Sequence, residues 1–206
     1  RWFNAAETTG LPVRPEFFAI PPQPPGHPLR VLVTGGSRGA RRLNQAVRDA
    51  APILKNARIT LQGGADLQPI DGVDTVAFIA DMPAAFAQAD LIVARAGAGS
   101  CAELAAAGKP SILVPFPYAA DDHQTKNAQA MERAGAAVLL RDADCTGPRL
   151  AEEIQKLTPE VLTNMAHDAR KVAKPGAAQR AADLLEELAG LTPPPKAETI
   201  VGGNVF

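Results

Sequence analysis

Short runs of apolar residues alternate with longer segments of mixed polarity through the middle of the chain. The short runs are rich in Val, Ile and Leu, which is typical of parallel strands that are buried on both faces. The longer segments place apolar residues at helical spacing, as in residues 40–54, where one face carries Leu43, Ala46, Val47 and Ala50. This pattern predicts strands near residues 30–34, 59–62, 75–79, 91–94, 111–114 and 137–140. It predicts helices near residues 40–54, 82–89, 101–107 and 121–134, and further helices over residues 148–188 with a break at Pro175-Gly176.

The alternation of strands and helices predicts an α/β fold, because parallel neighbours need a crossover connection. We expect a doubly wound, Rossmann-like parallel sheet of six strands within residues 29–190. Residues 1–28 hold seven prolines between Pro12 and Pro28, and are expected to form a semi-rigid interdomain linker. Residues 191–206, which include three consecutive prolines, are expected to be a flexible tail. The first residue is Arg1 instead of methionine, so we expect a fragment of a longer protein.

Composition and charge narrow the classes of function. The 206 residues suffice for one domain with a core, and 46% of them are hydrophobic. A net charge of −1 with scattered lysines and arginines argues against nucleic acid as a partner. The two cysteines form no CxxC motif and the three histidines are far apart, so neither a disulfide scaffold nor a metal site is expected. No apolar run approaches the ~20 residues that a membrane-spanning helix needs.

Three loops follow predicted strands at the sheet edge where ligands of such folds bind. The first is Gly35-Gly36-Ser37-Arg38-Gly39-Ala40, in which glycines let backbone N–H groups approach a phosphate. Its spacing is neither GxGxxG nor GxxxxGK(S/T), and the second strand ends in Gln62-Gly63-Gly64 without an acidic residue for an adenosine ribose. A tight turn and a phosphate-binding loop therefore fit this segment equally well.

The second loop, residues 95–103, reads Arg-Ala-Gly-Ala-Gly-Ser-Cys-Ala-Glu. Ser100 and Glu103 have the spacing of a capping box, in which the serine caps a helix and the glutamate reaches back to it. Alternatively, the donors of Gly97, Gly99 and Ser100 bind a diphosphate, while Glu103 accepts two hydrogen bonds from a ribose diol. The loop by itself favours the capping box and leaves the second interpretation open.

The third loop, residues 115–127, is stiffened by two prolines and ends in polar residues. His123, Gln124 and Asn127 offer the mixture of donors and acceptors that sugar hydroxyls need. The alternative is that Asp121 or Asp122 caps the following helix and the rest is solvated surface.

Two weaker signals are given ordinary interpretations. Asp142-Ala143-Asp144 has the D-x-D form of some metal-binding loops, but its place between a strand and a helix favours a simple loop or cap. Cys101 has no clear base beside it, and is expected to be a small helix residue that faces the core.

Five segments, in order along the chain, carry a family resemblance. They are Pro12-Val13-Arg14, residues 35–45 with their Leu-Asn-Gln end, Phe78-Ile79-Ala80-Asp81-Met82, residues 97–108, and residues 115–127 with their Asp-His-Gln-x-x-Asn end. Between about Gly10 and Leu188 the chain resembles the C-terminal half of the peptidoglycan enzymes of glycosyltransferase family 28. The resemblance implies the donor-binding domain of a GT-B fold, in which two Rossmann-like domains face each other across a cleft.

The activity implied by the resemblance is an inverting transfer of N-acetylglucosamine without a cofactor or a tightly bound metal. The donor would be UDP-N-acetylglucosamine, and the acceptor undecaprenyl-diphosphate-linked N-acetylmuramyl-pentapeptide. Arg14 and Ser37 would contact the donor from the cleft side. The backbone of Ile79 would meet the uracil, with Phe78 packing nearby.

The same resemblance assigns the remaining site residues. The diphosphate would face the second loop, at Gly97, Ala98, Gly99 and Ser100. Glu103 would hold the ribose hydroxyls, and Gln124, together with His123 and Asn127, would read the sugar.

The sequence also departs from the family pattern. The family motif Gly-Asn-Pro-Val-Arg reads Gly10-Leu11-Pro12-Val13-Arg14 here, and the N-terminal domain with its glycine-rich loop is absent from these 206 residues. The catalytic base and the contact with the lipid-linked acceptor are expected in that domain, with the whole enzyme cytoplasmic and peripheral on the inner face of the plasma membrane. The oligomeric state is left open. Three alternatives stay open: a stand-alone donor-binding subunit of a two-chain transferase, a related diacylglycerol glycosyltransferase, and an α/β domain whose glycines serve only turns.

Overall fold

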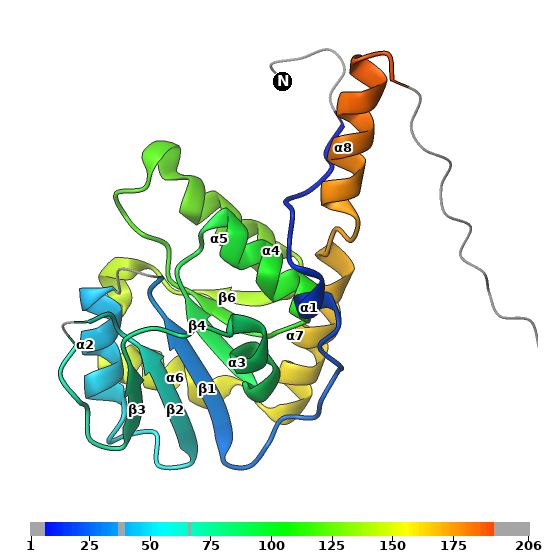
Figure 1. Ribbon diagram of the computed structural model, residues 1–206. Coiled ribbons are helices and arrows are strands. Elements are labelled where there is room, and N and C mark those ends of the chain that lie inside the picture. Colours follow the sequence, from blue (N-terminus) through cyan, green and yellow to red (C-terminus); the bar gives the residue numbers. More distant parts are fainter. Residues whose placement is uncertain (1–6, 37–39, 66, 192–206) are drawn as a thin grey trace, which may run out of the picture.

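The computed structural model describes residues 7–36, 40–65 and 67–191. Six parallel strands form one sheet in the order β3-β2-β1-β4-β5-β6 (Figure 1). The strands are β1 (Leu29–Thr34), β2 (Ala57–Gln62), β3 (Val73–Val76), β4 (Leu91–Ala94), β5 (Ser111–Leu113) and β6 (Ala137–Leu139). The chain starts at the centre of the sheet and winds outward in both directions, which confirms the predicted doubly wound α/β fold.

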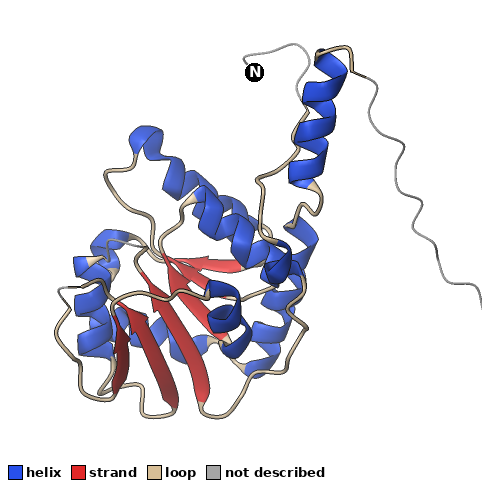
Figure 2. Ribbon diagram, viewed as in Figure 1, coloured by secondary structure: helices blue, strands red, loops and turns tan. Residues whose placement is uncertain are grey.

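Helices cover both faces of this sheet (Figure 2). They are α1 (Pro15–Phe18), α2 (Arg41–Ala50), α3 (Met82–Gln88), α4 (Ala98–Ala107), α5 (His123–Arg133), α6 (Gly147–Lys156), α7 (Pro159–Val172) and α8 (Ala177–Leu188). On one face, α2, α6 and part of α7 pack against Val31 and Val33 of β1. On the other face, α1, α3, α4 and α5 pack in a second core that includes Leu32. Successive residues of β1 thus serve both cores, because side chains alternate across a strand.

The helix α2 shows how the apolar pattern builds one of these layers. The four apolar residues predicted to share a face are all buried: Leu43, Ala46, Val47 and Ala50. Burial of a side chain such as Leu43 contributes about 1.5–3 kcal/mol relative to exposure. The helix ends at Ala50, four residues before its predicted end, because residues 51–53 turn toward β2.

Two further predicted elements also differ in their bounds. The predicted strand over residues 75–79 lies earlier, since β3 ends at Val76, opposite the last residue of β2, and leaves Phe78 and Ile79 in the following loop. The helix predicted from Cys101 begins at Ala98 instead, with Gly97 as its N-cap and no side chain bonded to the cap. The capping-box interpretation of Ser100 and Glu103 is therefore wrong, because a serine inside the helix cannot occupy the extended N-cap position.

Part of the N-terminal segment docks into the core. Phe17 of α1 is fully buried and packs edge-on against Phe86, with the ring centroids 5.1 Å apart. The Arg170 guanidinium of α7 donates a hydrogen bond to the carbonyl of Ile20 (2.6 Å). The proline content predicted a stiff segment, but it did not predict α1; the interdomain role of residues 1–28 stays a prediction.

The last helix, α8, extends away from the sheet alongside the N-terminal segment (Figure 1). Arg180 of α8 links the two through an ion pair with Glu7 (2.6 Å), and it also pairs with Glu187 within α8 (2.9 Å). Within the described ranges, no helix combines the length and apolar character needed to cross a membrane. The predicted tail lies outside the described residues beyond Leu191.

Candidate functional site

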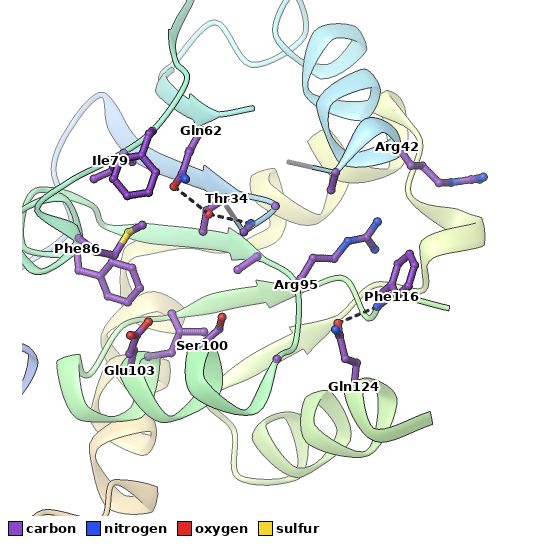
Figure 3. A pocket seen from close by; sticks show the side chains of 18 of the residues that line it. Thr34, Arg42, Gln62, Ile79, Phe86, Arg95, Ser100, Glu103, Phe116 and Gln124 are labelled. Carbon is purple, nitrogen blue, oxygen red and sulfur yellow. Dashed lines mark hydrogen bonds between the residues drawn. The ribbon is translucent and has the colours of Figure 1, made fainter. Parts of the chain in front are cut away.

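A cavity of about 910 Å³ opens at the carboxyl ends of the central strands (Figure 3). The loops after β1 and β4 both line it, and these neighbouring strands continue into crossovers that run in opposite directions. This is the topological switch point, where doubly wound sheets bind their ligands. Seven predicted site residues line the cavity: Arg14, Phe78, Ile79, Gly97, Ser100, Glu103 and Gln124.

The other five predicted site residues are not found in the lining of this cavity. Ser37 falls outside the described residues, and Ala98, Gly99, His123 and Asn127 are not among the residues that line this cavity. His123 is exposed, and its Nδ1 lies 2.6 Å from the carbonyl oxygen of Ala120. Asn127 donates from Nδ2 to the carbonyl of Ala96 (3.0 Å) and so holds the loop between β4 and α4.

The N-terminus of α4 forms one wall of the cavity. Gly97 and Ser100 line the cavity there, no side chain caps the helix, and its first turn carries no acidic residue. A Cβ atom added to Gly97 would meet only the Ser100 hydroxyl, at 3.8 Å, so the packing of the chain does not require a glycine. Free backbone N–H groups and the helix dipole make such an end suited to an anion that approaches closely.

Glu103 lies one turn further along α4. Its side chain is half-buried and lines the cavity, and within the described ranges it makes neither a hydrogen bond nor an ion pair. Desolvation raises the pKa of this carboxyl, while the positive charge of Arg14 opposes the increase. A partly buried carboxylate with free lone pairs can accept two hydrogen bonds from a pair of neighbouring hydroxyls.

The loop after β3 supplies an apolar wall beside Glu103. Phe78 is 66% exposed, and Ile79, Met82 and Phe86 also line the cavity. The loop is anchored by Asp81, whose carboxylate accepts a hydrogen bond from the N–H of Ala84 at the start of α3 (3.0 Å). Apolar side chains beside a polar backbone suit the flat ring of a base.

The opposite end of the cavity is formed by Gln124, Phe116 and Arg95 (Figure 3). The N–H of Phe116 donates to Oε1 of Gln124 (2.9 Å). This bond fixes the side-chain amide and leaves its NH₂ group available to donate toward a ligand. The cavity therefore has a polar end with Gln124 and an apolar end with Ile79, and the N-terminus of α4 lies between them.

At the start of α5, the alternative prediction that Asp121 or Asp122 caps the helix through its side chain is wrong. Asp121 and Asp122 have left-handed backbone conformations, with φ of 50° and 52°. Asp122 is the N-cap, but its side chain accepts no capping hydrogen bond. A capping side chain needs an extended backbone, which these two residues lack.

Several lining residues were not singled out by the sequence analysis. The hydroxyl of Thr34, at the end of β1, donates to Oε1 of the buried Gln62 at the end of β2 (3.3 Å), and accepts from the N–H of Gly36 (3.2 Å). Arginines 41, 42 and 95 also line the cavity. Each of these residues ends a strand or begins a helix at the predicted ligand edge, so inspection of every such position would have found them.

The charges around the cavity favour an anionic ligand. Four arginines line it, against the two carboxylates of Glu103 and Asp142. Asp142 is already paired with Arg95 (2.6 Å) and lies 3.7 Å from the guanidinium of Arg42. The remaining positive charge and the helix N-terminus suit a diphosphate.

The two weaker sequence signals have structural surroundings that explain them. Asp142–Asp144 form a short 3₁₀ turn, and within the described ranges no three His, Cys, Asp or Glu side chains gather as a metal site. Burial raises the pKa of the Cys101 thiol to about 11, so little thiolate forms near neutral pH.

The fold and the site together define a class: a Rossmann-like domain with a cavity suited to an anionic ligand at the switch point of its sheet. The family model for the glycosyltransferase family 28 C-terminal domain matches residues 30–188, and the chain belongs to this family.

Named relatives agree with this assignment. A protein of Solibacter usitatus is 58% identical over 196 residues, covering 89% of this chain and 54% of the relative. Its name is UDP-N-acetylglucosamine–N-acetylmuramyl-(pentapeptide) pyrophosphoryl-undecaprenol N-acetylglucosamine transferase. A protein of the same name from Xanthomonas euvesicatoria pv. vesicatoria is 45% identical over 207 residues, covering 91% of this chain and 48% of the relative.

A solved structure gives the same result. The crystal structure of Acinetobacter baumannii MurG superimposes with a TM-score of 0.72 at 33% identity, covering 90% of this chain and 57% of that one. The chain thus spans about half the length of the curated relatives it matches. Together with the all-parallel sheet, this similarity confirms the predicted C-terminal half of a GT-B glycosyltransferase.

Proposed function

We propose that this chain is the donor-binding half of an enzyme that transfers N-acetylglucosamine from UDP-N-acetylglucosamine to undecaprenyl-diphosphate-linked N-acetylmuramyl-pentapeptide. The relatives reported above are named for this reaction. The observation that carries the proposal is the Glu103 carboxylate, which faces the cavity one turn beyond the uncapped N-terminus of α4. A ribose diol would supply the hydrogen-bond donors that this carboxylate can accept, and a diphosphate the negative charge that the helix end attracts.

The two different ends of the cavity set the proposed direction of the donor. The uracil would lie against the backbone of Ile79 with Phe78 beside it, at the apolar end. The diphosphate would lie over Gly97 and Ser100, and the sugar would reach the free NH₂ group of Gln124. Arg14 and Ser37 would contact the donor from the open side.

The proposed chemistry is a single displacement with inversion. An acceptor hydroxyl attacks the anomeric carbon, the bond from that carbon to the diphosphate oxygen breaks, and UDP leaves with the electron pair. Positive charge around the cavity and the N–H groups of α4 would stabilise the negative charge that develops on this oxygen. The base that removes the proton from the acceptor is assigned to the part of the relatives that this chain does not span.

The same proposal extends to the acceptor and to location. The lipid-linked acceptor would be held by the part outside this chain, which would place the complete enzyme peripherally on the cytoplasmic face of the plasma membrane. This half would contribute the nucleotide-sugar site alone, so turnover would require both halves.

Calorimetric titration of the chain tests the donor assignment. UDP-N-acetylglucosamine would be titrated beside UDP-N-acetylgalactosamine, ADP-glucose and NAD, and the series repeated with Glu103→Ala. We expect selective binding of UDP-N-acetylglucosamine and a loss of at least about 100-fold in affinity in the variant, since two hydrogen bonds to a charged group are lost.

Glu160→Ala serves as the matched control, because Glu160 lies on α7 and does not line the cavity. This control should bind the donor as the unmodified chain does. Equal binding of NAD, undiminished binding by Glu103→Ala, or no binding of any nucleotide sugar would each contradict the proposal.

A further inference from the structure

The side chain of Arg95, at the edge of the cavity, is hydrogen-bonded to groups of two other loops. It follows β4 directly and is 14% exposed. Its Nη1 donates to the carbonyls of Val114 (3.1 Å) and Pro115 (3.2 Å), and to Oδ1 of Asp142 (2.6 Å). These acceptors lie after β5 and after β6, so one guanidinium joins three neighbouring loops.

Asp142 extends this connection to the first turn of α2. Its second carboxylate oxygen lies 3.7 Å from Nε of Arg42, near the start of α2, and Arg42 also donates to the carbonyl of Ala143. The Asp142 side chain is as well buried as that of Arg95, with 14% exposed. A carboxylate between two guanidinium groups in partial burial is a stronger link than an exposed ion pair.

The contacts of Arg95 lead toward Gln124 at the polar end of the cavity. The two carbonyls that it holds directly precede Phe116, and its guanidinium carbon lies 5.7 Å from the centre of the Phe116 ring. The N–H of Phe116 in turn fixes Oε1 of Gln124 (2.9 Å). Arg95 is therefore bonded to the carbonyl of the same peptide whose N–H holds Gln124.

The other half of the proposed donor site does not depend on this chain of contacts. Glu103 and Ser100 lie on α4, and Ile79 lies after β3, and none of them is bonded to Arg95 or Asp142. A change at Arg95 should consequently affect the sugar end of the cavity and spare the nucleotide end.

We propose that Arg95, held by Asp142, is a positioning residue for sugar selectivity: it orders the segment from Val114 to Phe116 so that Gln124 presents its NH₂ group to the sugar. This inference rests on the proposed function, and specifies how one part of that site achieves selectivity. In this proposal the D-x-D segment, Asp142–Asp144, has a structural role: the carboxylate of Asp142 holds the guanidinium of Arg95.

The test separates affinity for the nucleotide from affinity for the sugar. Dissociation constants for UDP, UDP-N-acetylglucosamine and UDP-N-acetylgalactosamine would be measured by calorimetry for the chain and for Arg95→Met, Arg95→Lys, Asp142→Asn and Gln124→Ala. We expect the preference of Arg95→Met for UDP-N-acetylglucosamine over UDP to fall about tenfold. Its dissociation constant for UDP should change less than twofold. Arg95→Lys keeps the charge but not the forked geometry, and should lose a smaller part.

A double-mutant cycle identifies the route of the effect. If Arg95 acts through Gln124, the combined Arg95→Met and Gln124→Ala variant should discriminate no worse than Gln124→Ala alone. Arg149→Met is the matched control, because Arg149 also pairs with two carboxylates but does not line the cavity. Thermal unfolding of every variant checks that it is folded, and Asp142→Asn tests the same link if Arg95→Met does not fold.

Each outcome decides a separate claim. Equal weakening of UDP and UDP-N-acetylglucosamine, unchanged selectivity, or fully additive effects in the cycle would overturn the positioning role. An unmodified chain that binds no UDP compound would instead overturn the proposed function on which this role rests.

Discussion

Charged and polar side chains are buried or half-buried at both ends of the sheet, but their partners differ. At the amino ends of the strands, the Asp90 carboxylate accepts three hydrogen bonds from Arg30, at 2.5–3.0 Å. There Lys109 donates to the carbonyl of Ala89 (2.7 Å), and Arg170 to those of Ile20 and Ala107. At the carboxyl ends, Glu103 and the NH₂ group of Gln124 face the cavity without a partner among the described residues.

The difference separates groups that stabilise the fold from groups that are free to bind. A buried ion satisfied by the chain holds two segments together, and its removal leaves an unpaired charge. A partly buried ion without a protein partner weakens the fold, and such a group is favourable only when a ligand supplies the partner. Variants of the satisfied groups at the amino ends should therefore change stability, and variants of Glu103 and Gln124 at the carboxyl ends should change binding.

The largest expected effect is on stability, from Asp90→Ala at the amino ends. The side chain of Asp90 is 2% exposed, whereas that of Arg30 is 39% exposed and can regain water. Removal of the carboxylate leaves the partly buried backbone N–H of Arg30 without its acceptor, so we expect the free energy of unfolding to fall by about 3 kcal/mol. Urea denaturation measures this change through the midpoint.

The control for this variant is Asp74→Ala, on the exposed side of β3, which should change stability by less than about 0.5 kcal/mol. The affinity of the folded Asp90→Ala variant for UDP-N-acetylglucosamine should stay within twofold. A large loss of binding with little loss of stability would break the division between the two ends.

The next largest effect uses the glycines at the two ends of α4. Gly108 has a left-handed backbone with φ of 60°, and a Cβ atom there would lie 2.4 Å from the Arg170 side chain. Gly108→Ala should lower the free energy of unfolding by about 2 kcal/mol. Gly97 has φ of −62° and ψ of 149°, which any residue adopts, so Gly97→Ala should change it by less than about 1 kcal/mol.

For the binding of UDP-N-acetylglucosamine the order should be reversed, with the larger effect at Gly97. A methyl group at Gly97 would occupy the space through which a diphosphate approaches the N–H groups of α4, so we expect about tenfold weaker binding of UDP-N-acetylglucosamine. Calorimetry and urea denaturation on both variants give the two pairs of values. If Gly97→Ala binds normally, the diphosphate does not approach this helix end.

The fold was predictable because local patterns determine most of it. The apolar runs and the amphipathic face of α2 predicted six strands and their order of alternation. The burial of Phe17 was not predictable, since it depends on Phe86, which is distant in sequence. The predicted end of β3 was wrong for a related reason. Phe78 and Ile79 are residue types that favour strands, but β2 ends at Gln62, which pairs with Val76, and so the pairing stops there.

The site was predictable only where one loop holds its own chemistry. Glu103 and Gln124 could be identified within their loops, although Ser100 and Glu103 also fitted a capping box that the structure does not form. The link between Arg95 and Asp142 joins residues 47 positions apart, so no local motif reveals it. The role of Asn127 was equally hidden, because its acceptor lies in another loop.

A smaller effect concerns Lys109, whose burial at the amino ends lowers the pKa of its amine to about 8, even though Asp90 opposes the shift. The charged form is disfavoured in the fold, so the cost is complete below pH 8 and decreases as the pH rises toward the ordinary value of 10.5. Relative to Lys109→Met, the unmodified chain should gain about 1 kcal/mol between pH 8 and pH 9. Urea denaturation at both pH values checks this, and a constant difference would contradict the assignment.

The smallest effect concerns two carboxylates, one at each end of the sheet, whose charges change the free energy of unfolding with opposite signs. Burial raises the pKa of Asp90, but the hydrogen bonds from Arg30 outweigh it, and the pKa lies below the ordinary 3.8. Its stabilising contribution is therefore complete above pH 3.8 and is lost as the pH falls through the folded-state pKa. Desolvation raises the pKa of Glu103 above the ordinary 4.5, so its cost is complete above the folded-state pKa and disappears below pH 4.5.

Urea denaturation as a function of pH distinguishes the two carboxylates through their isosteric amides. At neutral pH, loss of the stabilising charge makes Asp90→Asn less stable than the unmodified chain. Loss of the unfavourable charge makes Glu103→Gln more stable than the unmodified chain. On acidification the deficit of Asp90→Asn should shrink only below pH 3.8, whereas the advantage of Glu103→Gln should already have vanished by pH 4.5. Curves that move in the same direction would mean that Glu103 is satisfied within the chain, and the distinction between the two ends would then fail at its most important residue.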